Sequence, residues 1–463
     1  MNKPLIAVFL LINGVVLLNA ICHDPSRGYD AYHYWDYIEV FSEFRLPTPH
    51  DSAEFFSPPL PYLLPSFLYS FRTFDLRAAA KFAQLLNVLF SMGLTFYLIK
   101  TCDIIRPNDA HFKITSLAFL GMLPVYYKTF AFVRGEPLVA FLSVLVVYKT
   151  LTVFVQDACS LSNIVVLGFS LGLLILARQW GFFLFPAIII FVAVLMLKQK
   201  EKRLPFLKAT IVSLLIACMV GGWFYVHLYR QYGAIKAFNR PPRPVFSFSN
   251  QPSEFYFGLG LDKLFSDPIR NSFPNQFLPI FYSETWGDYW CYFVVYGRNV
   301  RKGRFLSGWQ LQKELSRDPP PLWLKTNRYD VRNYLGRVNL VSLFPSAILL
   351  AGIVVGIVYF GRFVGNYSAN DRITMYSLLA LVIAISFAGY FWFLVMYPSP
   401  GEGDTIKATY MLHTFPFVSI LAGEFLQRIR QESIHVYQAI LVLLAISTLH
   451  NFPVFITRYV SWP

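Results

Sequence analysis

The chain has 463 residues, of which 56% are hydrophobic and only 14% are charged. Soluble domains carry about 25% charged residues, so this composition excludes a soluble enzyme, whose surface needs far more polar side chains. The net charge of +14 would suit a nucleic-acid partner, but the Lys and Arg residues are scattered through loops and form no known nucleic-acid-binding motif. We therefore expect a protein that resides in a lipid bilayer and binds no nucleic acid.

Apolar runs long enough to cross a membrane recur along the whole chain. A helix needs about 20 apolar residues to cross the hydrocarbon core, and hydropathy windows of about 19 residues find about eleven such runs. They lie near residues 4–21, 79–99, 113–133, 138–156, 163–178, 182–197, 209–229, 340–360, 373–395, 409–426 and 436–457. The first run is expected to be a retained helix, because the bulky Ile21 before Cys22 does not fit a signal cleavage site. The sequence thus predicts an all-α polytopic membrane protein with about 11 transmembrane helices.

The loops between these runs predict the orientation of the chain. Basic residues follow two of the runs, and the positive-inside rule places such loops in the cytosol. These residues are Lys198, Lys200, Lys202, Arg203, Lys208, Arg428 and Arg430. Counting spans from these loops puts the N-terminus inside and two long segments, 22–78 and 230–339, on the outer face. The chain is thereby divided into a first part, 1–229, a mixed extracytoplasmic segment, 230–339, and C-terminal transmembrane helices, 340–463.

The first outer segment contains a candidate helix with two different faces. No helix breaker occurs from Tyr29 to Phe44, so this stretch is predicted to be one short helix. At about 100° per residue, one face carries Asp30, His33, Tyr34, Tyr37 and Phe41, and the opposite face carries Asp36, Glu39 and Glu43. The second face is typical of a solvated surface. Asp30, at the helix start on the aromatic side, is either an N-cap, where Asp is favoured, or a functional carboxylate.

A set of short motifs resembles the GT-C class of glycosyltransferases. In the first outer segment, the helix that begins near Asp30 is followed by Glu54 and then by Pro58-Pro59-Leu60-Pro61-Tyr62. Arg134-Gly135-Glu136-Pro137 resembles the family's acidic position before the fourth span, and Lys407-Ala408-Thr409-Tyr410-Met411-Leu412 resembles its late Lys/Arg-x-x-Tyr-x-Leu stretch. The order of these motifs is most similar to that in the bacterial branch that includes the aminoarabinose and protein mannosyl transferases.

This resemblance implies a membrane enzyme that transfers a hexosyl or pentosyl unit from a polyprenyl-phosphate donor to a glycan, lipid or protein acceptor. Transfer would take place on the non-cytosolic face of the bacterial cytoplasmic (inner) membrane, with inversion at the anomeric carbon. The active site would lie in segment 22–78, with Asp30 as the catalytic base, and no covalent sugar-enzyme intermediate is required. No cofactor is certain. A divalent metal stays open, although this chain has Asp30-Ala31 where the family often has Asp-Glu, which weakens the case for a metal.

Substrate-binding candidates follow from the need to stabilise an anionic leaving phosphate. Four cations lie near the outer ends of predicted spans, where cations are costly and often functional, although basic side chains there also reach lipid headgroups. They are Lys128, Arg134, Arg178 and Lys407. Arg178 is the strongest candidate, because a guanidinium can grip phosphate with two hydrogen bonds. The other candidates in this part of the analysis are His33, Glu54, Glu136, Tyr410 and His413. For His413, an interhelical hydrogen bond is the alternative to a place in the cavity.

The segment 283–290 of the larger outer segment packs aromatic residues around acids. Trp286 and Asp288 are candidates for acceptor binding, because sugar CH groups stack on aromatic rings and carboxylates accept hydrogen bonds from hydroxyls. The alternative is an interfacial aromatic belt without a substrate role.

Two other functional classes stay open. A transporter or lipid flippase would also have many spans, but the sequence has no inverted repeat or paired broken helices, which transporters commonly show. A polymerase of lipid-linked glycans would use arginines rather than an aspartate base. The substitution Asp30→Asn separates these classes, because it abolishes transfer only if Asp30 is the base.

Overall fold

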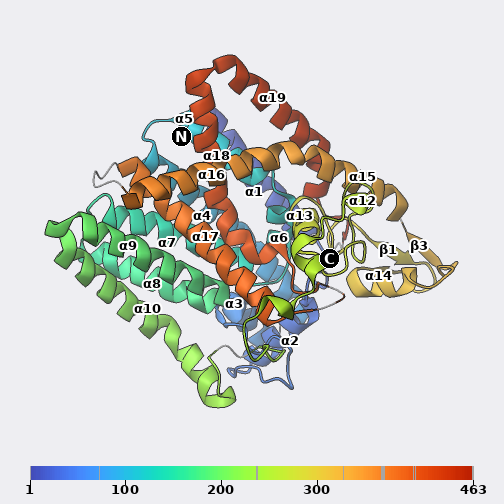
Figure 1. Ribbon diagram of the computed structural model, residues 1–463. Coiled ribbons are helices and arrows are strands. Elements are labelled where there is room, and N and C mark those ends of the chain that lie inside the picture. The colour runs from blue at the N-terminus through green and yellow to red at the C-terminus, as the bar shows by residue number, and fades with distance from the viewer. Residues whose placement is uncertain are drawn as a thin grey trace.

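The structure is a computed structural model that describes residues 2–71, 73–235, 238–326, 328–365, 371–399, 401 and 403–460. Most of the chain forms helices (Figure 1). The longer helices are α1 (Lys3–Cys22), α4 (Leu76–Ile105), α5 (Ala110–Gly121), α7 (Glu136–Phe154), α8 (Leu161–Ala177), α9 (Leu184–Lys198), α10 (Arg203–Tyr232), α15 (Arg328–Val341), α16 (Leu343–Gly365), α17 (Asp371–Met396), α18 (Phe415–Glu432) and α19 (Ile434–Asn451). The shorter ones are α2 (Ala31–Phe41), α3 (Leu60–Ser70), α6 (Pro124–Ala131), α11 (Ser253–Phe257), α12 (Leu261–Leu264), α13 (Phe277–Trp286) and α14 (Gly308–Leu315). Short 3₁₀ turns are η1 (Gln179–Phe183), η2 (Lys200–Lys202), η3 (Phe248–Asn250), η4 (Ala408–Thr414) and η5 (Phe452–Phe455).

Within the described residues, 8 helical segments are long and apolar enough to cross a membrane. They contain α1, α4, α7, η1 with α9, η2 with α10, α15 with α16, α17, and α19 with η5. The other three predicted spans coincide with α5 and α6, which are separate helices, with α8, which has 17 residues, and with η4 and the more polar α18. The predicted all-α polytopic membrane fold is confirmed, whereas the number 11 is not.

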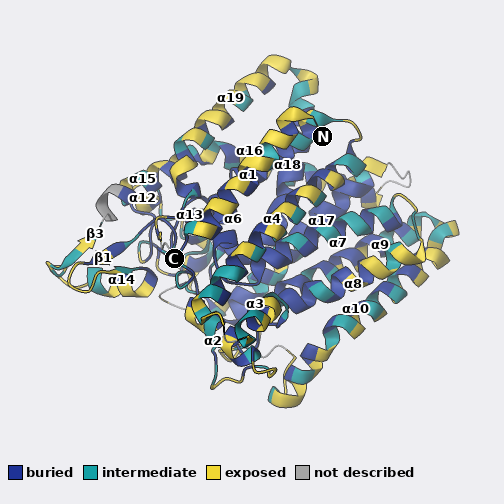
Figure 2. Cartoon of the chain, turned by 180° about the vertical axis from the view of Figure 1, so that it is seen from behind, coloured by how far each residue is buried: buried dark blue, intermediate teal, exposed yellow. Residues whose placement is uncertain are grey.

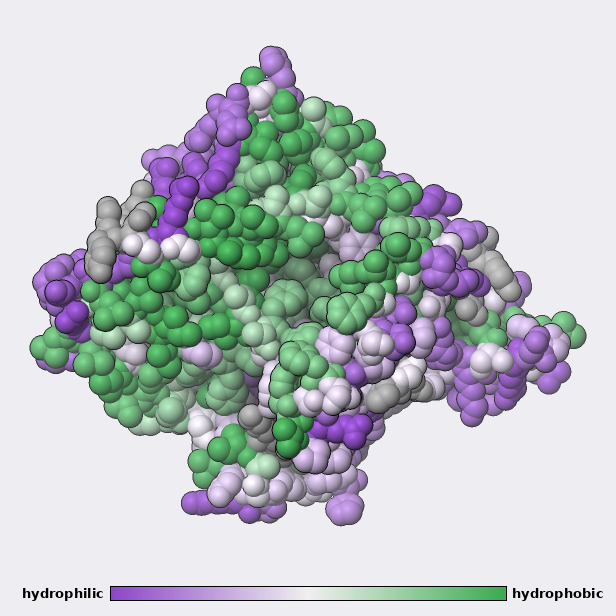
Figure 3. Space-filling model, viewed as in Figure 1, coloured by the Kyte–Doolittle hydropathy of each residue, from purple (hydrophilic) through white to green (hydrophobic). Residues whose placement is uncertain are grey.

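The outer surface of the helical bundle is apolar. Large side chains such as Met219 on α10 and Leu449 on α19 are 72% and 75% exposed, which in water would be unfavourable but in lipid is the expected arrangement. Exposed residues follow the outward faces of these helices in Figure 2. In Figure 3 apolar residues cover much of the bundle, and hydrophilic residues gather on the protrusion that carries the small sheet. This division agrees with helices in a bilayer and a protruding part in water.

Two interruptions in the apolar runs bring polar groups into the bundle. The run 161–198 breaks after α8, where the backbone of Arg178 is extended (φ −168°, ψ 155°) before η1 begins. The last turns before α18 form η4 instead of α-helix, and Lys407 precedes them with φ −130° and ψ 114°. Both residues lie outside regular helix, and both side chains line the same cavity.

The first outer segment contains α2 and α3, so the predicted helix from Tyr29 to Phe44 is present but shorter. Three tyrosines hold the two helices together: the ring centroids of Tyr34 and Tyr37 lie 5.5 and 4.6 Å from that of Tyr62. All three are buried. This aromatic contact holds α2 against α3, and the three tyrosines share a buried cluster with Ala79 and Ala80 of α4.

Segment 230–339 contains short helices and a small antiparallel sheet in the order β2-β1-β3. The strands are β1 (Gly297–Asn299), β2 (Arg304–Leu306) and β3 (Leu324–Thr326). In the register, Gly297 of β1 pairs with Leu306 on one side and Thr326 on the other.

The two outer segments meet at one end of the molecule. Arg27 donates a hydrogen bond of 2.8 Å to the carbonyl of Phe305, and the Tyr29 hydroxyl contacts the Glu284 carboxylate. The C-terminal end of α10 is at the same end, since the rings of Phe55 and Tyr232 lie 5.0 Å apart. A 30-residue helix is about 45 Å long, so the basic loop that precedes α10 lies at the opposite end.

Candidate active site

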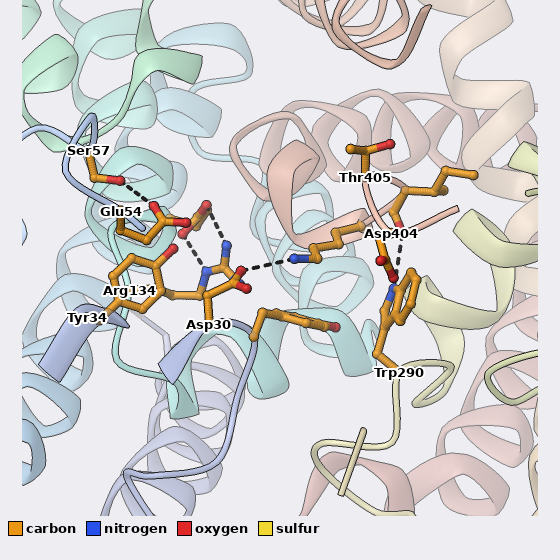
Figure 4. A network of polar contacts seen from close by, with 12 residues as sticks. Asp30, Tyr34, Glu54, Ser57, Arg134, Trp290, Asp404 and Thr405 are labelled. Atoms are coloured by element: carbon orange, nitrogen blue, oxygen red, sulfur yellow. Dashed lines mark hydrogen bonds and ion pairs between the residues drawn. The ribbon is translucent and has the colours of Figure 1, made fainter. Parts of the chain in front are cut away.

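A cavity of about 530 Å³ lies where the outer segments join the helical bundle. Residues from 1–229, from 230–339 and from 340–463 form its walls. Of the residues singled out in the sequence, Asp30, Glu54, Arg178, Lys407 and Tyr410 line it. Figure 4 shows the polar contacts, with Glu54 and Ser57 on one side of Asp30 and with Asp404 and Trp290 on the other.

Asp30 precedes α2 but does not cap it. Its backbone is left-handed, with φ 55° and ψ 23°, and its side chain makes no hydrogen bond to the helix. Left-handed backbone is unfavourable for a residue other than glycine, and here it accompanies an ion pair of 3.1 Å between the Asp30 carboxylate and Nζ of Lys407. The N-cap alternative is therefore not realised, and the carboxylate faces the cavity.

Neighbouring charges keep both members of this ion pair ionised. Burial alone would raise the pKa of the Asp30 carboxyl, but Lys407 and Arg134 outweigh it and hold the pKa below its usual value. Burial alone would lower the pKa of Lys407, but Asp30 and Tyr410 raise it above its usual value. Asp30 is thus a carboxylate and Lys407 an ammonium at neutral pH.

Aromatic and backbone contacts fix Lys407 in place. Its Nζ lies 5.0 Å from the centroid of the Tyr29 ring and 5.8 Å from that of Tyr410, distances at which ring faces attract a cation. Its backbone N–H donates a hydrogen bond of 2.8 Å to the hydroxyl of Tyr390 on α17.

Arg178 joins the first outer segment to the bundle. It donates hydrogen bonds of 3.0 Å to Glu54 and 2.9 Å to the hydroxyl of Tyr34, and it also contacts Ser57. Its Nε lies 3.3 Å from a carboxylate oxygen of Glu136. The Arg178 side chain is only 4% exposed, so it is a buried, highly connected cation rather than a free one.

Arg134 and Glu136 lie directly behind the cavity wall. Arg134 donates two hydrogen bonds, of 2.6 and 2.8 Å, to the Glu136 carboxylate. Its guanidinium lies 5.1 Å from the Tyr29 ring and 5.6 Å from the Tyr410 ring. The pair thus supports two rings that line the cavity and forms no part of its surface.

The remaining sequence candidates are elsewhere. His33 is exposed and lies 3.6 Å from Asp36. His413 is buried and 3.0 Å from the Ser386 hydroxyl of α17, which is the interhelical alternative. Trp286 is buried at the end of α13, and Asp288 accepts four backbone hydrogen bonds from residues 292–295. Because these oxygens are already occupied, Asp288 organises the turn after α13 instead of reaching the cavity.

Glu284 and Lys128 anchor the residue before Asp30. Lys128 is fully buried, lies 2.5 Å from the Glu284 carboxylate and donates hydrogen bonds of 3.0 Å to the carbonyls of Glu284 and Gly287. Burial raises the pKa of Glu284 well above its usual value, and Asp288 adds to this rise. Because Glu284 also contacts the Tyr29 hydroxyl, α6 and α13 together hold the start of α2.

Several cavity residues were not found from the sequence. Arg270 donates a hydrogen bond of 3.0 Å to Asp404, and its guanidinium carbon lies 4.0 and 4.9 Å from the ring centroids of Trp309 and Trp290. Arg240 is exposed and donates a hydrogen bond of 3.3 Å to the Ser399 hydroxyl. Asp404 lies close to the Lys407 motif, and Trp290 is the last residue of the segment 283–290 that the sequence indicated, whereas no motif marked Arg240, Arg270 or Trp309.

The residues around Asp30 do not fit a divalent metal. Within the described part of the chain, no group of three or more His, Cys, Asp or Glu residues could hold one. The carboxylate of Asp30 is instead paired with Lys407, and Arg134 adds further positive charge. The Lys407 ammonium and the Arg134 guanidinium would repel a divalent cation at Asp30.

Comparisons with known proteins agree with this fold. No family model and no curated protein matches the sequence. Among solved structures, the oligosaccharyltransferase of Archaeoglobus fulgidus in complex with Zn and sulfate is similar, with 14% identity, a TM-score of 0.51, and coverage of 98% of this chain and 53% of that chain. The chain therefore spans about half the length of that protein. This likeness confirms the predicted GT-C-like fold.

Two further solved structures are similar with lower scores. Oligosaccharyltransferase AglB from Archaeoglobus fulgidus, in complex with an inhibitory peptide and a dolichol-phosphate, has 11% identity and a TM-score of 0.48, with 98% of this chain and 56% of that chain covered. ArnT from Cupriavidus metallidurans in the apo state has 13% identity and a TM-score of 0.38, with 91% and 76% covered.

Proposed function

We propose that this protein, with its GT-C-like fold, is a membrane glycosyltransferase that transfers a sugar from a polyprenyl-phosphate donor to an acceptor. The donor class is inferred from the sequence motifs that resemble the GT-C family. The observation that carries the proposal is the ion pair of 3.1 Å between Asp30 and Lys407 on the wall of the cavity. It puts a base and a cation side by side, which are the two groups that this transfer needs.

The proposed reaction is a single displacement with inversion. An acceptor oxygen or nitrogen attacks the anomeric carbon, and the bond from that carbon to the phosphate oxygen breaks with its electron pair on the phosphate. The acceptor proton passes to the Asp30 carboxylate, which is ionised because its pKa is held low. Lys407 offsets the charge that develops on the phosphate. No second carboxylate is needed as a nucleophile.

Arg240 is the cavity cation best suited to receive the donor phosphate. Lys407, Arg178 and Arg270 each pair with a carboxylate at 3.0–3.1 Å. Arg240 contacts the Ser399 hydroxyl, and in the described part of the chain it has no carboxylate partner. A phosphate at Arg240 would therefore gain a charge-assisted contact without breaking an existing ion pair.

The test uses the purified full-length protein, a panel of radiolabelled polyprenyl-phosphate sugars and membranes as the source of acceptor, with released polyprenyl phosphate as the readout. At least one donor should be consumed. Arg240→Gln should raise the donor KM roughly ten- to a hundredfold, the effect of losing one charge-assisted hydrogen bond. Arg243→Gln is the matched control, since Arg243 is also exposed but does not line the cavity. Failure of the folded protein to consume any donor would reject the proposed function, and equal KM values for both variants would reject the role of Arg240.

We also place the active site on the non-cytosolic face, with the N-terminus inside. The basic loop before α10 lies at the end of the molecule opposite the two outer segments, and the positive-inside rule favours that loop in the cytosol. The five native cysteines are free and can be replaced by serine. A cysteine at position 300, where Val300 is 55% exposed, should then react with a membrane-impermeant thiol reagent in intact cells. One at position 201 should react only after permeabilisation, and the reverse pattern would invert the orientation.

A further inference from the structure

The part of the cavity beyond Lys407 has a chemical character of its own. It contains the Arg270–Asp404 ion pair and the indoles of Trp290 and Trp309. Trp290 donates a hydrogen bond of 3.1 Å to the carbonyl of Ile406, the residue directly before Lys407. Trp290 is therefore held by the same short stretch of chain that carries Lys407.

The Arg270–Asp404 ion pair does not favour an anion as its ligand. The guanidinium of Arg270 is balanced by the Asp404 carboxylate at 3.0 Å, so the pair as a whole is close to neutral. An incoming phosphate would have to compete with Asp404 for Arg270 and would be repelled by that carboxylate. A neutral ligand that can both donate and accept hydrogen bonds meets no such cost.

The exposed indole favours a ligand that can pack on an aromatic ring, in addition to being neutral. Arg270 is only 4% exposed and lies over both indoles, which hold its planar group in one orientation. Trp309 on α14 is 48% exposed although it lines the cavity, so part of its ring is available to a ligand. A sugar ring fits both requirements, since its C–H groups pack on an indole while its hydroxyls donate to Asp404 and accept from Arg270.

We infer that Asp404, Arg270 and Trp309, with the buried Trp290 ring supporting Arg270, form a subsite for a neutral sugar ring beside the Asp30–Lys407 pair. The inference rests on the proposed function and names the chemistry of one of its substrates. The sugar at this subsite belongs either to the donor or to a saccharide acceptor.

The test is binding of methyl glycosides of common hexoses and pentoses to the purified full-length protein in nanodiscs, followed by tryptophan fluorescence. At least one glycoside should bind saturably to the wild type. Trp309→Ala should weaken this binding roughly tenfold, because the ring on which the sugar packs is lost. Asp404→Asn should weaken it roughly tenfold or more, because a hydrogen bond from a sugar hydroxyl to a charged carboxylate is lost. Trp223→Ala is the matched control, because Trp223 is also 48% exposed but lies on α10 outside the cavity. Trp309→Phe, which keeps a ring, should bind more tightly than Trp309→Ala.

Competition with donor shows whether the sugar at the subsite belongs to the donor or to the acceptor. The experiment also tests the subsite separately from the proposed function. Exclusion of the glycoside by a polyprenyl-phosphate sugar, but not by the polyprenyl phosphate alone, assigns the subsite to the donor. Simultaneous binding of donor and glycoside assigns it to the acceptor. Absence of saturable binding to the wild type, or unchanged binding in Trp309→Ala and Asp404→Asn, overturns the subsite. Because binding is measured without turnover, failure of the donor panel to react would reject the proposed function and leave this result standing.

Discussion

Asp30→Asn should reduce turnover by at least about 10²- to 10⁴-fold, which is the usual contribution of a positioned general base. The amide has almost the same shape as the carboxylate but cannot take the acceptor proton. Lys407 keeps its contacts with Tyr29 and Tyr410, so the donor KM should not rise. Turnover and KM are measured with the donor that the wild type consumes.

Asp36→Asn is the control for this variant. Asp36 lies on the same helix, but its side chain is 46% exposed and its ion-pair partner is the surface residue His33. Its replacement should change turnover little, because exposed pairs contribute at most about 1 kcal/mol. Equal turnover of wild type and Asp30→Asn would remove the catalytic assignment and favour the arginine-dependent polymerase.

The pH dependence of kcat/KM tests the role of Asp30 independently. Its pKa is held below the usual value of 3.8, so the carboxylate stays ionised down to that pH, and the proton-accepting form is lost only as the pH falls further. With an acceptor that does not titrate in this range, kcat/KM should stay constant from about pH 8 to about pH 5. An acidic limb with a midpoint above about pH 5 would show that another group, or an unpaired Asp30, controls the reaction.

Several sequence candidates line the cavity in the structure, because local signals in the sequence marked them. Asp30 stood at the aromatic side of a helix start, and Arg178 and Lys407 were cations at the ends of apolar runs. In the structure both cations lie just outside regular helix, which explains why a charge next to an apolar run was a useful signal. The geometry of their partners could not be read in the same way, since Arg178 and Glu54 are 124 residues apart.

The sequence did not predict the part of the cavity beyond Lys407, and the reasons are physical. Arg270 and Asp404 are separated by 134 residues, and only tertiary packing brings them together. Within 283–290 the sequence selected Trp286 and Asp288, but α13 ends at Trp286. The turn after it consumes the Asp288 carboxylate and brings Trp290 to the cavity wall. Composition identified the correct segment, and a helix boundary decided which of its residues reached the site.

Arg178→Met should destabilise the fold by about 3–5 kcal/mol, the cost of removing one partner from a buried charge network. The methionine fills much of the same space, but Glu54 and Glu136 lose a cation that contacts both of them. Glu136 keeps Arg134, whereas the described contacts of Glu54 leave it with no other ion-pair partner and a side chain that is 6% exposed. The uncompensated carboxylate is the main source of the expected loss.

Lys202→Met tests whether this cost depends on burial. Lys202 and Asp157 form an ion pair of 2.9 Å whose side chains are 36% and 53% exposed, so its loss should cost at most about 1 kcal/mol. Thermal unfolding of both variants in the same detergent compares the two pairs directly. Arg178→Lys should fall between wild type and Arg178→Met, because an ammonium keeps the charge but cannot reach Glu54, Tyr34 and Glu136 at once. If Arg178→Met instead unfolds like the wild type and only its donor KM rises, Arg178 is a phosphate ligand, and the first outer segment must be held to the bundle by its aromatic contacts.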